Sequence, residues 1–402
     1  MTLDTHKIRY PVIAILTGAV AMGLIFFLPE KIIEVKNHVF VPLEPSPVPR
    51  VNSVFTPDIG PPGQLAEPPK VVKAVYLTGW SGGNEAKIRE VVSLSKAGKI
   101  NAVVVDIKDF SGQTFVFPRP NALLKRLHDE NIYVIARLAV FQDQVLTKAR
   151  PELAVKSIKL GQSATASDDL WRDNKGLAWI DPAASASWGY NIEIARDAWD
   201  RGFDEINFDY IRFPTDGDMP DRKFPVWDGK RLMSSVMREF FRAIRSELPE
   251  AVISADLFGL AATSFYDFGV GQMIEDAYDH FDFVSPMLYP SHFPLSFLGP
   301  PMQSSLSADL EYKKPAEHPY EVVRKSMDTA ILRLESRLGS KAALRPWLQD
   351  FDLGADYDAD KVRAQIQAVV DSFGGENPPA GGVDYRGFML WNPANVYTHE
   401  AL

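Results

Sequence analysis

The chain has 402 residues, with 43 Lys and Arg against 52 Asp and Glu and a net charge of −9. It contains no cysteine, which excludes disulfides, thiolate nucleophiles and cysteine-ligated metal sites. The acidic balance argues against nucleic acid as a partner, because phosphate binding needs clustered Lys and Arg. Hydrophobic residues make up 46% of the chain and charged residues 24%, which are the proportions of a folded globular protein.

Residues 11–28 carry no charge and are long enough, at roughly 1.5 Å per residue, to cross the ~30 Å hydrocarbon layer of a membrane. Lys7 and Arg9 precede this segment, so the positive-inside rule places residues 1–10 in the cytoplasm. A cleaved signal peptide and a buried core helix are the alternatives, but no small-x-small cleavage site follows the segment. We therefore expect a signal-anchor and a single-pass membrane protein whose main domain lies outside the cytoplasm, in the cell envelope or periplasm.

Nine prolines occur between Pro42 and Pro69, within the segment 29–70. Few large apolar residues accompany them, so the segment buries too little surface to fold and favours extended polyproline geometry. We predict that 29–70 is a linker between the membrane anchor and a domain that spans 71–402.

From Val71 onward, short apolar runs alternate with amphipathic helical patterns. The predicted strands are 72–80, 102–109, 133–140, 205–213, 252–259, 283–290, 344–351 and 387–393. The predicted helices are 84–97, 122–130, 186–201, 231–248, 319–338 and 359–373. Strand–helix alternation favours parallel strands, and eight such units predict an α/β fold, the (β/α)8 TIM barrel. An open, doubly wound sheet is the alternative, but the first strand leads into GWSGG, which lacks the G-x-G-x-x-G spacing.

Polar side chains alternate with apolar ones along several of these strands. The fourth predicted strand places on one face Asn207, Asp209 and Ile211, and on the other Ile206, Phe208 and Tyr210. Asp106 and Lys108 share a face of the second strand, and Asp256 lies on the polar face of the fifth. We expect these polar faces to point into the barrel near the carboxyl ends of the strands, where barrel active sites form.

Asp209 lies inside an apolar run, where a buried carboxylate is costly unless it is paired. It is interpreted either as the partner of Arg212 or Lys108 in an ion pair, or as a catalytic carboxylate. Glycoside cleavage uses two carboxyl groups, one to protonate the leaving oxygen and one to attack or to activate water. We predict Asp209 as the principal catalytic residue. The candidates for its partner, in order of preference, are Asp256, Asp106 and Asp350, the last of which strand parity turns outward.

Further polar and aromatic residues fall near the same strand ends, where aromatic rings pack on the apolar faces of sugars. The predicted substrate-binding residues are Trp80, Lys108, Arg137, Arg212, Tyr289, His292, Trp347, Gln349 and Trp391. No metal and no cofactor are expected, because the sequence has no H-x-x-x-H or H-E-x-x-H pattern. The G-x-S-x-G turn of serine hydrolases is also absent.

Several motifs between Val71 and Asn395 together resemble the "putative glycosyl-hydrolase domain" family, which is grouped with TIM-barrel glycosidases. The motifs that carry the resemblance include VKAVYLTGWSGG, AVVVDIKDFSG, WRDNKGLAWIDPA, GFDEINFDYIRFP, PMLYPSHF, RPWLQDF and GFMLWNPAN. The resemblance implies a (β/α)8 barrel that acts on polysaccharide, with no particular substrate. GFDEINFDYIRFP is also similar to the strand-four motif of family 18 chitinases. Ile211 stands where that motif has its acidic Glu, so chitinase-type catalysis is not expected.

Our hypothesis is a membrane-anchored, extracytoplasmic glycosidase that cleaves a cell-envelope or exported polysaccharide. The alternative is a noncatalytic polysaccharide-binding or assembly protein on a glycosidase-derived barrel. A metal-dependent deacetylase would need a His/Asp cluster that the sequence lacks. The expected partners are thus the polysaccharide and the membrane.

Overall fold

The computed structural model describes residues 58–161, 169–299 and 313–402. All of the described residues belong to one compact unit, and residues 1–57 lie outside them. The predicted anchor at 11–28 therefore lies outside them as well. In the described ranges, no helix is both long enough and apolar enough to cross a membrane.

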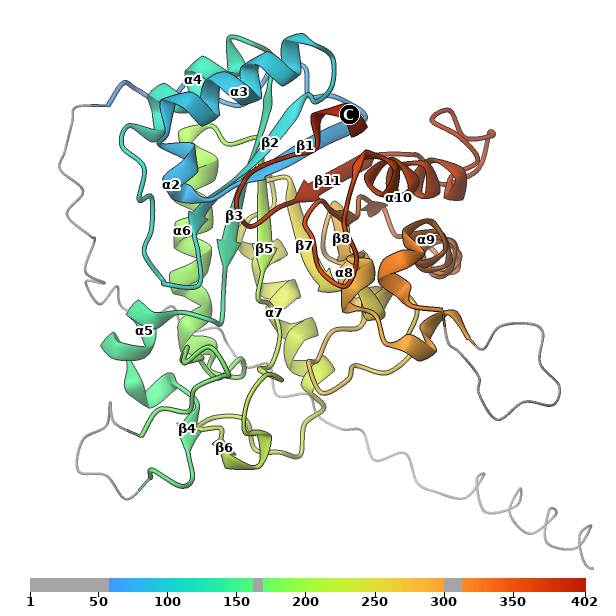
Figure 1. The fold of residues 1–402 in the computed structure, drawn as a ribbon. Helices are drawn as coiled ribbons and strands as arrows, with labels where there is room; N and C mark the ends of the chain where they lie inside the picture. Colours follow the sequence, from blue (N-terminus) through green and yellow to red (C-terminus); the bar gives the residue numbers. More distant parts are fainter. Residues whose placement is uncertain (1–57, 162–168, 300–312) are drawn as a thin grey trace, which may run out of the picture. The chain divides into compact units, whose positions relative to one another are not determined.

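Parallel strands form a closed barrel, as the sequence predicts (Figure 1). In ring order they are β1 (Val72–Leu77), β2 (Ala102–Lys108), β3 (Tyr133–Ala139), β5 (Glu205–Asp209), β7 (Ile253–Phe258), β8 (Phe283–Met287), β10 (Trp347–Gln349) and β11 (Gly387–Trp391). The ring closes because β10 pairs with both β8 and β11, and β11 pairs with β1. A short strand, β9 (Ala343–Leu344), also pairs with β8. Pro346 separates β9 from β10, because proline has no N–H to donate to a ladder.

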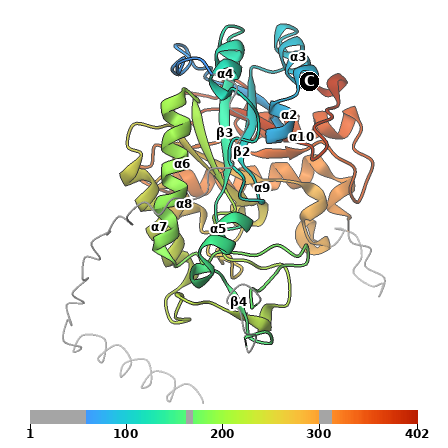
Figure 2. The same ribbon diagram turned by 90° about the vertical axis from the view of Figure 1, so that its left-hand side faces the viewer.

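The six predicted helices are all present, with ends within a few residues of those expected. They are α3 (Glu85–Lys96), α4 (Pro120–His128), α6 (Trp188–Arg201), α7 (Met233–Glu247), α9 (Pro319–Glu335) and α10 (Ala359–Ser372). Asn84 caps α3, since its side chain accepts a hydrogen bond from the Ala86 N–H at 2.9 Å. Figure 2 shows α6 and α7 side by side on the outside of the barrel, and α6 contacts β3 and β5.

Shorter elements lie between these. They are α2 (Gly79–Gly82), α5 (Gln144–Ala149), α8 (Ile274–Tyr278), the antiparallel pair β4 (Lys156–Ser157) and β6 (Arg222–Lys223), and 3-10 turns at Pro151–Leu153, Ser185–Ser187, Met219–Asp221, Gly259–Ala262, Pro290–His292, Leu295–Leu298, Pro315–Glu317 and His399–Ala401. The pair β4–β6 joins the segments that follow β3 and β5 at their carboxyl ends.

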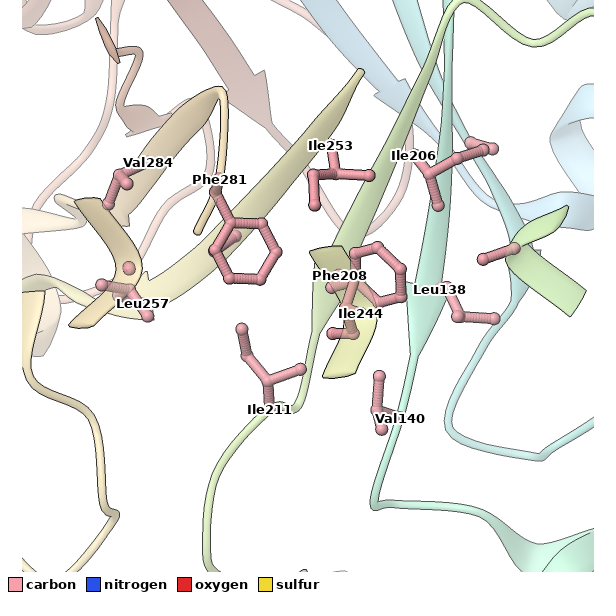
Figure 3. Close-up of a cluster of buried hydrophobic side chains, with 14 of the residues drawn as sticks. Leu138, Val140, Ile206, Phe208, Ile211, Ile244, Ile253, Leu257, Phe281 and Val284 are labelled. Carbon is pink, nitrogen blue, oxygen red and sulfur yellow. The ribbon is translucent and has the colours of Figure 1, made fainter. Parts of the chain in front are cut away.

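Side-chain alternation along the strands divides the buried apolar residues into two cores. The outer core lies between strands and helices, and Figure 3 shows part of it around Ile206, Phe208 and Ile244. The inner core fills the barrel, with Tyr76 and Trp347 among its members. A barrel of this size is packed inside rather than hollow, so polar groups must gather near the strand ends.

Residues 58–65, which the sequence analysis assigned to the linker, contact the barrel domain. Gln64 donates from Nε2 to the Trp199 carbonyl at 2.6 Å, and the Leu65 N–H donates to Asp204 Oδ1 at 2.5 Å. Gly202 ends α6 at a φ of +104°, and a Cβ there would lie 2.6 Å from the Gly63 carbonyl oxygen. This approach explains the glycine. The folded unit therefore extends upstream of residue 71.

Candidate active site

Three carboxylates from three strands surround the guanidinium of Arg137. Arg137 lies on β3, and its Nη1 donates to Asp106 Oδ1 on β2 at 2.6 Å. Its Nε donates to Asp209 Oδ2, at the end of β5, at 3.2 Å, and Nη2 donates to the same oxygen. Asp256 Oδ2, on β7, lies 3.8 Å from Nε. The three aspartates that the sequence analysis selected thus lie together inside the barrel.

The charge balance of this cluster depends on Arg137, which is 5% exposed. Burial opposes the positive charge, but Asp106 and Asp209 outweigh it and raise the pKa of Arg137 well above its ordinary value. Removing two carboxylates and a guanidinium from water is costly, and mutual pairing is what compensates. Arg137 is therefore the cation that holds the acidic cluster together.

Asp256 is the most deeply buried of the three aspartates. Its Oδ1 accepts hydrogen bonds from Asn207 Nδ2 and from Trp347 Nε1, both at 2.8 Å. Its Oδ2 is buried and has no hydrogen-bond partner among the described residues. Burial, together with the nearby charge of Asp209, raises the pKa of Asp256 well above the ordinary value. These surroundings favour the protonated form of Asp256.

Asp209 has a different environment and is the least buried of the three, with 6% exposure against 1% for Asp256. Besides Arg137, it is held by the N–H of Tyr210, which donates to Oδ1 at 2.5 Å. Tyr210 has a φ of +53°, a left-handed conformation that costs an aromatic residue on the order of 1–3 kcal/mol. Such strain is typical of functional sites, where the surrounding structure maintains it.

The conformation of Tyr210 interrupts the side-chain alternation along the strand. One prediction from that alternation was therefore wrong. Ile211 was expected on the same face as Asp209, but it packs in the outer core near Val140 and Phe281 (Figure 3). Tyr210 was expected to face outward, and its ring packs against the outer core, 5.8 Å from the ring centroid of Trp179. Tyr210 contacts Asp209 through its backbone N–H, a contact that side-chain alternation does not predict.

Asp106 is held by a second residue that the sequence analysis did not select. Tyr76 donates its hydroxyl to Asp106 Oδ2 at 2.5 Å, and its ring stacks on Trp391 at a centroid distance of 4.0 Å. Trp391 also faces Arg137, whose Cζ lies 4.8 Å from the ring centroid. Burial raises the pKa of Asp106, while Arg137 and the Tyr76 hydroxyl oppose the rise. Side-chain alternation along β1 places Tyr76 on the inward face, so its position in the site could have been predicted from the sequence.

The other predicted substrate-binding residues lie in varied surroundings. Trp347 is buried and holds Asp256, whereas Trp391 is partly exposed and Trp80 is 68% exposed. Tyr289 is nearly buried, and its ring contacts the exposed His292 edge-on at 5.5 Å. Although His292 is exposed as a residue, partial burial of its imidazole beside Tyr289, aided by the charge of Lys175, lowers its pKa and favours the neutral form.

Gln349 is fully buried, and its Oε1 accepts hydrogen bonds from the N–H and the hydroxyl of Ser291. Its Nε2 donates to the Phe351 carbonyl at 2.9 Å. The amide thus links the segments that follow β8 and β10. Asp350 accepts hydrogen bonds from the Thr398 N–H at 2.9 Å and the Thr398 hydroxyl at 2.7 Å, away from Arg137.

Lys108 does not face the carboxylate cluster, contrary to the prediction from strand parity. The β2–β3 register shifts between Asp106 and Lys108, which turns the lysine away from the barrel interior. Its ammonium is fully buried, 2.7 Å from Asp143 Oδ2 and 3.0 Å from Asn191 Oδ1 on α6. Burial lowers its pKa, and Asp143 opposes this. Lys108 therefore holds β2 against α6 and neither ionises Asp106 nor contacts a ligand there.

Among the residues that the structure describes, no group of three or more His, Asp and Glu side chains is arranged to hold a metal ion. The site brings carboxyl groups together in pairs. Arg137 Nε is close to both Asp209 and Asp256, so their nearest oxygens are closer than the roughly 9.5 Å upper limit for glycosidase carboxyl pairs.

Solved structures with similarity to this chain include several glycosidases. A hypothetical protein from Ruminiclostridium thermocellum ATCC 27405 is 40% identical over 45% of this chain and 96% of its own, with a TM-score of 0.40. Alpha-L-fucosidase isoenzyme 2 from Paenibacillus thiaminolyticus is 12% identical over 82% of this chain and 48% of its own, with a TM-score of 0.49. TtGalA, an alpha-galactosidase from Thermus thermophilus in complex with stachyose, is 12% identical over 84% of this chain and 65% of its own, with a TM-score of 0.46.

No curated protein matches the chain. A family model described as "Putative glycosyl hydrolase domain" matches residues 74–397, which include the whole barrel from the third residue of β1. The match covers well over half of the sequence and all of the site residues described above. This protein therefore belongs to that glycosyl hydrolase family.

Proposed function

We propose that this protein cleaves glycosidic bonds in a cell-envelope or exported polysaccharide, with Asp209 and Asp256 as its catalytic pair. The observation that carries the proposal is the contrast between the two carboxyl groups around Arg137. Asp209 is paired with the guanidinium of Arg137 through two donors, Nε and Nη2. Asp256 has a raised pKa and an unpartnered Oδ2. Glycoside cleavage uses two carboxyl groups in different environments, one of which gives a proton to the leaving oxygen.

In the proposed reaction, Asp256 donates its proton from Oδ2 to the glycosidic oxygen while the bond to the anomeric carbon breaks. Asp209 either attacks the anomeric carbon or removes a proton from the attacking water. In the first course, water later hydrolyses the glycosyl–Asp209 ester, and Asp256 takes the proton from that water. In both courses, Arg137 and the Tyr210 N–H hold the oxygens of Asp209 in place. Asp106 and Tyr76 position Arg137, while Trp391, Trp80, Tyr289 and His292 contribute contacts to the sugar.

Replacing Asp256 with Asn tests its role as general acid. The variant should lose activity on polysaccharide by roughly 10²–10⁴-fold, because an amide cannot protonate the leaving oxygen. It should keep more of its activity on a dinitrophenyl glycoside, since that leaving group departs without a proton. Initial rates on both substrates measure the difference. Equal losses on the two substrates would show that Asp256 is not the acid.

We further propose that residues 11–28 anchor the protein in a membrane and that the barrel lies on the extracytoplasmic side. The support is an uncharged segment of spanning length that follows Lys7 and Arg9. In a bacterial host, the full-length protein should stay in the membrane pellet after alkaline carbonate extraction, and protease added to spheroplasts should digest the barrel. Release into the supernatant, or protection from protease until lysis, would contradict this topology.

The second candidate function is polysaccharide binding without cleavage. The observation that favours it is that Asp256 is only 1% exposed, so a substrate oxygen must displace covering groups to reach it. The same barrel would then bind sugar through its partly exposed aromatic residues and leave the polymer intact.

A further inference from the structure

Arg212 lies three residues after Asp209, between two aromatic rings. Its Cζ lies 4.6 Å from the ring centroid of Trp179, in the segment after β3, and 4.6 Å from that of Phe258, at the end of β7. The side chain is half-buried, and the ring of Tyr210 is 5.8 Å away. The guanidinium is thus held at the carboxyl ends of the strands, next to the proposed catalytic pair.

Unlike the deeply buried arginines, Arg212 has no carboxylate partner within the described residues. Arg137, Arg333 and Arg345 each form an ion pair with an Asp or Glu. Arg212 donates only from Nη1, to the Phe213 carbonyl at 3.1 Å and to Thr215 Oγ1 at 3.5 Å. Its Nε and Nη2 have no partner in those ranges, and neither is among the fully buried unpartnered atoms. These N–H groups therefore have no hydrogen-bond partner within the described residues.

The Trp179 ring, which lies against Arg212, is buried and hydrogen-bonded. Trp179 is 1% exposed, and its Nε1 donates to Asp173 Oδ2 at 3.0 Å. The other oxygen of Asp173 accepts hydrogen bonds from the Lys175 N–H at 2.9 Å and the Leu177 N–H at 3.0 Å. One buried carboxylate thus fixes the segment that carries both the ring beneath Arg212 and the exposed Lys175. The ammonium of Lys175 is close enough to His292, after β8, to contribute to its lowered pKa.

Burial opposes the charge of Arg212 and lowers its pKa, while Tyr210, Asp209 and Asp216 oppose this shift. An anion that accepted hydrogen bonds from Nε and Nη2 would also stabilise the charge. A guanidinium binds a planar carboxylate or a sulfate through two parallel hydrogen bonds, and partial burial strengthens them.

We propose that Arg212 binds the carboxylate or sulfate group of an acidic saccharide next to the bond that Asp209 and Asp256 cleave. The inference rests on the proposed function, because it names the substrate class of that site as an anionic polysaccharide. Arg212 recognises the acidic group, Trp179 and Phe258 keep the guanidinium in place, and Lys175 adds positive charge at the same end of the barrel.

Binding by the full-length Asp209→Asn protein tests the proposal without requiring cleavage. The probes are two matched pairs: polygalacturonate with its fully methyl-esterified form, and dextran sulfate with dextran. We expect tighter binding to the acidic member of at least one pair, and the pair that responds identifies carboxylate or sulfate. Adding Arg212→Gln should weaken that binding about tenfold or more, since hydrogen bonds between charged groups are lost. Binding to the neutral polymer should not change.

Arg222→Gln is the matched control, because Arg222 is also partly buried and lies against an aromatic ring, with its Cζ 5.4 Å from the Phe224 ring centroid. It should leave all four affinities unchanged, and thermal unfolding verifies that each variant is folded. Equal or better binding to the neutral polymer in both pairs would overturn the proposal. An equal loss from the two arginine variants would also overturn it. Absence of cleavage by the wild type would contradict the proposed function alone, since binding is measured separately.

Discussion

Replacing Asp209 with Asn should reduce cleavage of the polysaccharide substrate by roughly 10³-fold or more while leaving the fold intact. The amide can neither attack the anomeric carbon nor take a proton from water, so the catalytic contribution of the carboxylate is lost. The amide oxygen can still accept hydrogen bonds from Arg137 or from the Tyr210 N–H, which now hold the carboxylate. Steady-state rates and thermal unfolding of the full-length variant measure the two effects.

Asp350→Asn is the control for this experiment. Asp350 lies close to the carboxyl end of a barrel strand, but its oxygens bind Thr398 rather than Arg137. Its replacement should leave the rate close to that of the wild type. A wild-type rate for Asp209→Asn, or an equal loss in the two variants, would contradict the assignment of Asp209.

Replacing Arg137 with Met should lower the free energy of unfolding by about 3–5 kcal/mol, because it leaves Asp106, Asp209 and Asp256 together without their cation. Methionine retains the apolar stem but supplies no charge and no donor. Urea unfolding of the full-length variant measures the loss. Arg137→Lys is the matched control, and it should lose less, since it keeps the charge but not the paired donors.

The loss in Arg137→Met should depend on pH. Burial already raises the pKa of Asp106 and of Asp256, and without Arg137 both should rise further. A carboxyl group whose pKa is raised by folding binds its proton more tightly in the folded state, so stability falls as pH rises above the ordinary aspartate pKa. The difference from the wild type should therefore grow from acidic to neutral pH. A difference that is absent, or largest in acid, would contradict the structural role of Arg137.

The barrel itself could be predicted from the sequence because its strands are short apolar runs separated by clear helical patterns. The seventh strand is the exception, since the predicted strand at 344–351 is divided by Pro346 into β9 and β10. The helix α8 was not predicted, because five residues carry too little periodicity to distinguish a helix from a loop. The start of the domain was placed too late, since prolines near 58–70 do not reveal the contacts made by Gln64 and Leu65.

The site could be predicted where side chains alternate without interruption. Asp106, Asp209 and Asp256 lie before any irregularity in their strands, and all three reach Arg137. The predicted side-chain directions were wrong directly after two irregularities. These are the register shift before Lys108 and the positive φ of Tyr210. Alternation assumes a regular extended backbone, so it does not predict these two irregularities.

The resemblance to a glycosyl hydrolase family is confirmed by the match over 74–397. The strained residue Tyr210 directly follows Asp209, and strain of this kind is typical of functional sites. The guanidinium of Arg212 narrows the substrates to test to acidic saccharides.

The most direct measurement compares wild-type and Asp209→Asn protein on one polysaccharide that both bind. Reducing ends released over time report cleavage, and affinity electrophoresis in the same gel system reports binding. We expect the wild type to generate new reducing ends and Asp209→Asn to bind the polymer without shortening it. Tight binding by both proteins, with an intact polymer in each case, would contradict hydrolysis and leave a barrel that only binds.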